Sequence, residues 1–279
     1  MTAAIARQLF QQELHPSDAQ INLERAALYI AMEAYPDLDV EAYLNALDTM
    51  AAEVEERLPA TRYPMQVLRA INQYLFEDLG FVGNRTEYYD PRNSFLNEVI
   101  DRRTGIPITL ALVYLAIARR IEFPMVGVNM PGHFLIRPAI AEMEVFVDPF
   151  HQGEILFLQD CQTLLAKVFD RPVDVRPEYL ESIGNRQFLG RMLTNLKVIY
   201  VNQKDFHHAL DALDRILLLF PDLPLEIRDR GVLHYRLNRY RSARQDFEYY
   251  LKISPLAEDA QLIREILADL PEEDGIPDD

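Results

Sequence analysis

The residues best suited to chemistry are a histidine and an aspartate in the middle of the chain. His133 stands in the segment PGHFLIRP, and Asp148 follows fifteen residues later in VFVDPFHQG. Both segments are rich in strand formers, so pairing of the two strands would bring the side chains together. A carboxylate that accepts a hydrogen bond from one imidazole nitrogen orients the ring as a general base. The pair therefore indicates either two members of a catalytic triad or a structural histidine held by a carboxylate.

A second group of polar side chains precedes a long apolar stretch, in the segment YYDPRNSFLNEVIDRR. Asn93 and Asn97 could line a groove near His133 or, alternatively, bond the backbone of their own loop. Arg102 lies at the end of this segment, and Arg137 shares a strand face with His133. Guanidinium groups make paired hydrogen bonds to carboxylates. We therefore expect these two arginines to hold a carboxylate, either internal or from a ligand.

Composition excludes several classes of partner and cofactor. The 279 residues carry 28 Lys and Arg against 44 Asp and Glu, a formal net charge of -16, which disfavours direct binding to nucleic acid or to anionic membranes. Neither GxGxxG nor GxxxxGK[ST] occurs, so no nucleotide cofactor is expected, and no histidine, cysteine or acid cluster has metal-ligand spacing. The single cysteine, Cys161, suits a reducing compartment. A soluble cytoplasmic protein of undetermined oligomeric state is expected.

Hydrophobic patterning predicts the elements that must position these residues. Helices are expected at about 17–36, 40–58 and 64–79, and a helix that is apolar on every side at 107–120. Strand-forming segments follow at 125–128, 134–136 and 145–147, and a further helix at 158–169. The simplest arrangement is a small antiparallel sheet wrapped on the buried helix, behind an N-terminal helical layer. The predicted class is α+β, predominantly helical.

A period of 34 residues marks the last third of the chain. It relates Ala209 to Ala243, Leu213 to Phe247, and Pro221 to Pro255. Small, bulky and proline residues in this order are typical of a tetratricopeptide repeat, a pair of antiparallel helices. Gly231 supplies the close-approach glycine of the second repeat, whereas Lys197 stands at that place in the first. The pattern predicts two helical hairpins and one additional helix from about residue 258 to 270.

Together, these motifs resemble a known family. The segments RRTGIPITLALVYLAIARR, PGHFLIR and DPFHQG look like the transglutaminase-like, papain-related core, and their order resembles the bacterial SirB-type family, in which this core precedes tetratricopeptide repeats. The resemblance implies a helical layer plus transglutaminase-like domain at 1–185, repeats at 186–270 and an acidic tail at 271–279. It also implies a nucleophilic cysteine at the start of the buried helix.

The sequence departs from the family pattern at that nucleophile. The position falls within 106–109, and none of these residues is a cysteine. Thr109 is the nearest hydroxyl, but it is far less acidic than a thiol and would need strong activation. Cys161 lies in the helix expected after the strands, so it could reach His133 only if the chain folded back. We therefore expect a protein-interaction or regulatory module that binds a protein or peptide through its groove or its repeats.

Two alternatives remain from the residues alone. The first is an acyl-transfer enzyme or amide hydrolase, with His133 as base, Asp148 as its orienter and a hydroxyl or water as nucleophile. The second is a sensor that binds a small carboxylate through Arg102 or Arg137.

Overall fold

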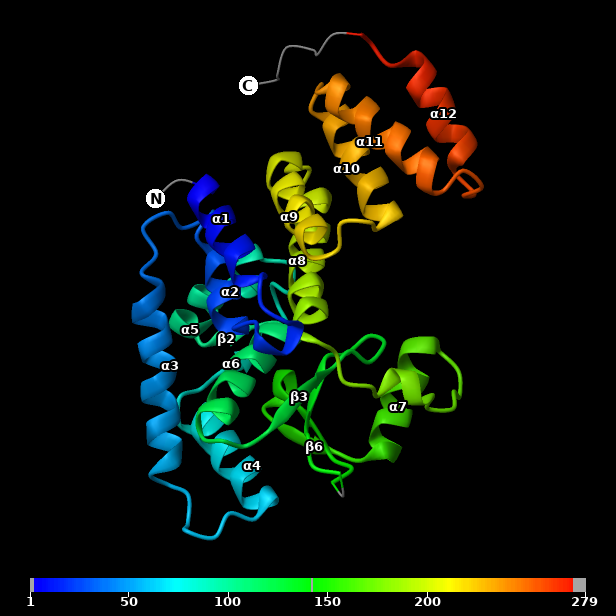
Figure 1. Cartoon of the computed structure of the whole chain (residues 1–279). Coiled ribbons are helices and arrows are strands. Elements are labelled where there is room, and N and C mark those ends of the chain that lie inside the picture. The colour runs from blue at the N-terminus through cyan, green and yellow to red at the C-terminus, as the bar shows by residue number, and fades with distance from the viewer. Residues whose placement is uncertain (1–2, 142, 273–279) are drawn as a thin grey trace. The chain divides into compact units, whose positions relative to one another are not determined.

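The computed structural model describes residues 3–141 and 143–272, and the fold is α+β with helices predominating, as the sequence predicted (Figure 1). The α-helices are α1 (Ala3–Glu13), α2 (Leu23–Ala31), α3 (Val40–Glu55), α4 (Pro64–Asn72), α5 (Leu96–Arg102), α6 (Pro107–Arg120), α7 (Leu158–Phe169), α8 (Asn185–Asn202), α9 (Phe206–Leu219), α10 (Pro224–Arg236), α11 (Tyr240–Ile253) and α12 (Ala260–Asp269). The strands are β1 (Val82–Gly83), β2 (Thr104–Gly105), β3 (Met125–Val128), β4 (Leu135–Pro138), β5 (Phe146–Asp148) and β6 (Glu154–Leu156).

The N-terminal layer consists of α1 to α4, and it packs on one side of α6 (Figure 1). Helix α1 was not expected, and α2 begins later than the sequence suggested. Asn22 caps α2, because its side-chain oxygen accepts a hydrogen bond from the Arg25 backbone N–H at 3.0 Å. Ser17 instead precedes a short 3-10 turn, and its hydroxyl donates to the Gln20 side chain at 2.7 Å. The helix expected from about residue 17 therefore begins at Leu23, after this turn.

Helix α6 forms the centre of the first unit. Its side chains are buried almost all round, as its unbroken apolar sequence predicted. The sheet lies against α6 on one face and against α7 on the other (Figure 1). Alternate strand residues supply the face toward α7, where they pack with Cys161 and Leu165: Val128, Leu135, Phe146 and Leu156. Residues at the ends of β4 and β5 are thereby held close to the start of α6.

The four-stranded sheet has the order β3-β4-β5-β6, with every neighbouring pair antiparallel. The sequence did not predict β6, which has only three residues. It also missed the parallel pair of β1 and β2, in which Val82 lies opposite Thr104 and Gly83 opposite Gly105. Strands this short show no periodicity. The β1–β2 pair nevertheless ties the loop after α4 to the residues just before α6.

The second unit contains the predicted helical repeats. Helices α9, α10 and α11 pack in sequence as antiparallel neighbours. Ala209 and Ala243, the small residues of the 34-residue period, are fully buried, and so are their bulky partners Leu213 and Phe247. Small residues at these positions allow the helices to approach closely, so the period has the packing origin expected for tetratricopeptide repeats.

Lys197 has a structural role at the position where the second repeat has glycine. Its ammonium lies 2.6 Å from a Glu226 carboxylate oxygen and 3.2 Å from Asp229, both on α10. The lysine is only 12% exposed, so burial of its charge is compensated by these two acids. In the first repeat, an ion pair to the following repeat therefore replaces close helix approach.

The chain forms two compact units, and the boundary between them lies between Met192 and Leu193, within α8. The boundary expected near residue 185 falls where α8 begins. Of the expected acidic tail, residues 273–279 lie outside the described part of the chain. Across the described residues, no helix is both long enough and apolar enough to cross a bilayer.

The close contact at Gly231 gives a stability prediction. A Cβ at Gly231 would lie 2.6 Å from Cε1 of Phe247, a fully buried ring. Alanine normally favours a helix over glycine by up to about 1 kcal/mol. Here we expect Gly231→Ala to lower the free energy of unfolding by about 1–3 kcal/mol through overpacking. Urea unfolding of the full chain measures it.

The control is the same substitution in a Phe247→Leu background, where the contacting ring atom is missing. The cost of Gly231→Ala should shrink there, so the two substitutions should be non-additive. Equal costs in both backgrounds would show that the ring does not restrict this position.

Candidate functional site

His133 and Asp148 open onto one small cavity of about 220 Å³, called here the His133 pocket. It is lined by Tyr88, Pro107, Gly132, His133, Phe134, Asp148, Phe150 and His151. The turn before β4 supplies His133, the end of β5 supplies Asp148, and the first residue of α6 supplies Pro107. The fold therefore brings together the histidine, the aspartate and the helix start that the sequence singled out.

Asp148 is buried and its carboxylate is fully engaged. Oδ1 accepts from the backbone N–H groups of Phe150 at 3.0 Å and His151 at 3.3 Å, which caps the 3-10 turn 149–151. Oδ2 lies 2.8 Å from Nδ1 of His151, and the ionised carboxylate is an acceptor, so the ring nitrogen donates. The structure thus pairs Asp148 with His151. No hydrogen bond joins Asp148 to His133 in the described structure.

His133 is half-buried in a turn, where its backbone N–H donates to the Met130 carbonyl at 2.9 Å. Burial lowers the pKa of the imidazole below its usual value of 6.5. The negative charge of Asp148 opposes this shift, whereas the nearby charges of His151 and Lys167 add to it. His133 is therefore neutral at pH 7, with its ring available to the pocket.

Of the residues 106–109, Pro107 is the one that faces the pocket. Proline is favourable at the first position of a helix, because its φ is already set and the missing N–H has no intrahelical partner there. It offers neither a thiol nor a hydroxyl. The position next to His133 and Asp148 therefore carries no side-chain nucleophile.

Comparison with known families identifies both parts of the chain. The transglutaminase-like superfamily matches residues 41–194, more than half of the chain, and the tetratricopeptide repeat matches 196–268. The chain belongs to the transglutaminase-like superfamily. The expected order, a transglutaminase-like core followed by tetratricopeptide repeats, is confirmed.

Individual relatives differ in how much of the chain they share. A UPF0162 protein of Xylella fastidiosa (strain 9a5c) is 37% identical over 263 residues, which cover 92% of each chain. F-box only protein 21 of Mus musculus is 33% identical over 168 residues, 56% of this chain and 26% of that one. The crystal structure of menin that reveals its binding site for Mixed Lineage Leukemia protein aligns at a TM-score of 0.42 and 14% identity, over 96% and 75% of the two chains. That structural likeness is too weak to inform function.

Thr109 lies inside the transglutaminase-like core, away from the His133 pocket. It is fully buried, and its hydroxyl oxygen lies 2.7 Å from the Asn93 carbonyl and 3.1 Å from the Ile106 N–H, which donates to it. The hydroxyl therefore bonds the start of α6 to the preceding loop. Because the Thr109 hydroxyl is buried and hydrogen-bonded, it is not exposed to a substrate in the pocket.

Cys161 is equally remote from solvent. It is fully buried on α7 among apolar side chains, and burial raises the pKa of its thiol to about 11. A thiol with so high a pKa is protonated at neutral pH and weakly nucleophilic.

None of the four predicted binding residues lines the His133 pocket. Asn93 is buried and holds its loop, because it accepts from Asn84 Nδ2 at 3.1 Å and donates to the Glu87 carbonyl at 2.7 Å. Arg102 has its guanidinium 4.0 Å from Asp90, an internal carboxylate. Asn97 on α5 is buried, and Arg137 lies on β4 opposite Val126. A contact between any of these four residues and a ligand stays a prediction.

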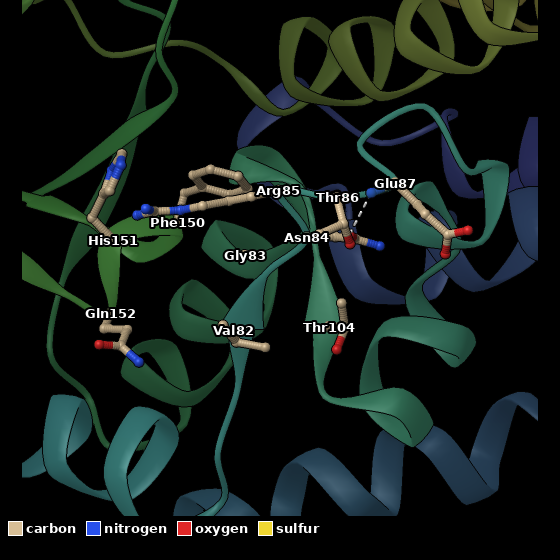
Figure 2. Close-up of a pocket in the computed structure, with 10 residues that line it drawn as sticks. All are labelled: Val82, Gly83, Asn84, Arg85, Thr86, Glu87, Thr104, Phe150, His151 and Gln152. Carbon is tan, nitrogen blue, oxygen red and sulfur yellow. Dashed lines mark hydrogen bonds between the residues drawn. The ribbon is translucent and has the colours of Figure 1, made fainter.

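A larger hollow of about 640 Å³ adjoins the His133 pocket and shares Phe150 and His151 with it. We call it the Arg85 pocket, and Figure 2 shows its lining side chains on β1, on β2 and on the loops that follow β1 and β5. Gly83 permits this arrangement, since a Cβ there would lie 2.5 Å from the Phe150 ring. Sequence patterns did not indicate this hollow, because it depends on the β1–β2 pair, which they had not predicted.

Four rings form a continuous row along both pockets. Tyr89 packs edge-on against Tyr88, Tyr88 against Phe150, and Phe150 against His151, with centroid distances of 5.3, 6.0 and 5.4 Å. Tyr89 is 65% exposed and Tyr88 39% exposed. We call the two pockets together with this row the aromatic groove. Its exposed tyrosines were visible in the sequence as YYD, but nothing there placed them beside His133.

The low pKa of His133 predicts a defined pH dependence. Because the unfolded chain binds a proton at about pH 6.5 and the folded chain only at lower pH, folding excludes a proton in this window. Stability should fall as the pH drops below about 6.5 and level off below the folded pKa. His133→Gln should remove part of this fall, which urea unfolding at a series of pH values measures.

The substitution Lys167→Gln tests whether the charge of Lys167 contributes to the low pKa of His133. It removes a positive charge that lowers the pKa of His133, so the pKa should rise toward 6.5. NMR titration of the imidazole measures this directly. A pKa that does not rise would show that Lys167 does not act on the ring.

Proposed function

We propose that this protein is a non-catalytic protein-interaction and regulatory module of the bacterial cytoplasm. The aromatic groove of its transglutaminase-like unit holds a segment of a partner polypeptide without forming a covalent bond. Tetratricopeptide repeats commonly bind peptide segments, so the second unit supplies a further surface for a protein partner. The single buried cysteine suits a reducing compartment, and the net charge of -16 argues against nucleic acid as the partner.

The observation that carries this proposal is Pro107 in the His133 pocket. Covalent acyl transfer needs a nucleophile beside its base. Proline supplies none, and it also lacks the backbone N–H that a nucleophilic residue often donates to the oxyanion of the tetrahedral intermediate. One residue thus removes two requirements of the reaction while leaving the cavity open.

The engagement of Asp148 supports the same conclusion. A catalytic histidine is held in its productive tautomer by a carboxylate. Here the Asp148 carboxylate accepts hydrogen bonds from His151 and from two backbone N–H groups. His133 lacks that orienting hydrogen bond, so it is better suited to contact a bound chain than to accept protons in turnover.

The alternative is hydrolysis by an activated water, and one observation favours it. The Asp148–His151 pair at 2.8 Å is the arrangement in which a carboxylate orients an imidazole, and His151 lines both pockets. In that case, His151 or His133 would remove the proton from water as it attacks an amide. This enzyme would need no nucleophilic side chain.

Covalent reactivity separates a non-catalytic groove from acyl transfer. Wild type and His133→Ala are treated with hydroxyl- and thiol-directed acylating probes, and adducts are mapped by mass spectrometry. We expect no His133-dependent adduct, because Pro107 cannot react and Thr109 and Cys161 are buried. Labelling of either residue that vanishes in a folded His133→Ala variant would establish an enzyme instead.

Site-specific photocrosslinking tests partner binding. A photoreactive benzoylphenylalanine replaces Tyr89 in the groove or, as a matched control, Tyr63 before α4, which is 62% exposed. In cells of the bacterial host, Tyr89 should give a discrete adduct with an intact polypeptide, and Tyr63 should not. Phe150→Ala should weaken the adduct, because it removes a ring of the groove. Equal yields at both positions would contradict the proposal, and recovery of cleaved partner would favour hydrolysis.

A further inference from the structure

The aromatic groove is bordered by positive charges that have no ion-pair partner within the described part of the chain. Arg85 lines the Arg85 pocket, with its guanidinium carbon 6.0 Å from the centre of the Phe150 ring, and Figure 2 shows the two side chains next to each other. Lys167 on α7 is exposed and precedes Val168, whose Cγ2 would lie 2.5 Å from a Cβ on Gly132 in the lining of the His133 pocket. Arg85 and Lys167 therefore place positive charge at two points of the groove.

Several other basic side chains of this acidic protein, in contrast, are bound by acids. Glu24, for example, binds both Arg119 and Arg120 at 3.0 and 2.7 Å. On α10, Arg228 and Arg230 each bind two aspartates: Asp229 and Asp259, and Asp214 and Asp246, respectively. Arg85 and Lys167 have no such acid in the described part of the chain. They therefore give the aromatic groove local positive charge in a protein of net charge -16.

The acids that do face the groove leave this positive surface largely intact. The Asp148 carboxylate is buried and accepts hydrogen bonds from two backbone N–H groups and from His151, so both of its oxygens have partners within the protein. Glu87 is the remaining carboxylate that lines the Arg85 pocket. Two carboxylates, Asp148 and Glu87, therefore line the groove, and only Glu87 has no partner among the groove residues described above.

The row of rings gives the same surface an apolar component. Tyr89 and Tyr88 are exposed, and Phe150 lies between them and the imidazole of His151. Rigid aromatic rings contact side chains of a bound chain at low entropic cost. Their alternation with cations matches a peptide that carries carboxylates on either side of an apolar residue.

We propose that the aromatic groove selects an acidic peptide segment of a partner protein. Arg85 and Lys167 bind its carboxylates, and an apolar residue between them packs on Tyr88 and Phe150. This inference rests on the proposed binding function and adds the chemistry of the ligand. Guanidinium and ammonium hydrogen bonds to carboxylates are short and strong where the site is partly shielded from water. Repulsion by the rest of the protein would favour release of acidic chains that do not fit the groove.

Selection from a display library of random seven-residue peptides tests the ligand chemistry. The bait is the full-length protein, and the bound peptides are sequenced. We expect wild type to enrich peptides with two or more Asp or Glu residues around an apolar or aromatic residue. The best peptide should bind about tenfold more tightly than its Asn and Gln counterpart by fluorescence anisotropy, and added salt should weaken it.

Matched charge reversals locate the site. Arg85→Glu and Lys167→Glu should each weaken the best peptide about tenfold or more. Lys252→Glu on α11 changes the net charge by the same amount on an exposed residue of the second unit, and it should leave affinity within about twofold. Thermal melting confirms that each variant is folded, and Arg85→Gln provides a milder substitution if the reversal destabilises the chain.

Several outcomes would overturn the proposal: no peptide enriched above background, selected peptides that are not acidic, or equal losses in the groove variants and in Lys252→Glu. Crosslinking from Tyr89 would still report on the proposed binding function in those cases. Persistent crosslinking together with neutral or basic selected peptides would show that the groove binds a chain of different chemistry.

Discussion

The transglutaminase-like unit depends on satisfying the polar backbone where a helix buried on all sides begins. The first amide groups of a helix have no partner within it, and Ile106, Ile108 and Thr109 at the start of α6 are buried. A single hydroxyl solves this problem: Thr109 accepts from the Ile106 N–H and lies 2.7 Å from the Asn93 carbonyl. Asn93 in turn holds the loop that carries Tyr88, through the Glu87 carbonyl. One buried network therefore fixes both Pro107 and one wall of the aromatic groove.

Competition between two histidines for one carboxylate decides the character of the pocket. His151 is three residues from Asp148 within the same turn, and the carboxylate already caps that turn. Forming this hydrogen bond orders little additional chain, whereas an imidazole on another strand must be brought to the same oxygen by the whole sheet. His151 is therefore the favoured partner. His133 is left half-buried and neutral, since burial penalises its charged form more than the neighbouring Asp148 can compensate.

Long, strongly patterned elements could be predicted from the sequence, and short or tertiary features could not. The apolar run of α6, the end of β5 at Asp148 and the 34-residue period each leave a signal over many positions. Likewise, a common cavity for His133 and Asp148 followed from strand pairing. The choice of His151 over His133 left no pattern, because it depends on side-chain directions after a three-residue turn. Resemblance located the nucleophile position only to within four residues, and the pocket lining singles out Pro107 among them.

An enzyme and a binding module make opposite demands on the same groove. Catalysis requires contacts that strengthen only in the transition state, so that the ground state is not held too tightly. The contacts that this groove offers are exposed rings, a cation and imidazoles, which suit the holding of a polypeptide segment. Proline at position 107 stabilises the helix start without adding reactivity. On the proposed binding function, these contacts would hold an intact chain rather than convert it.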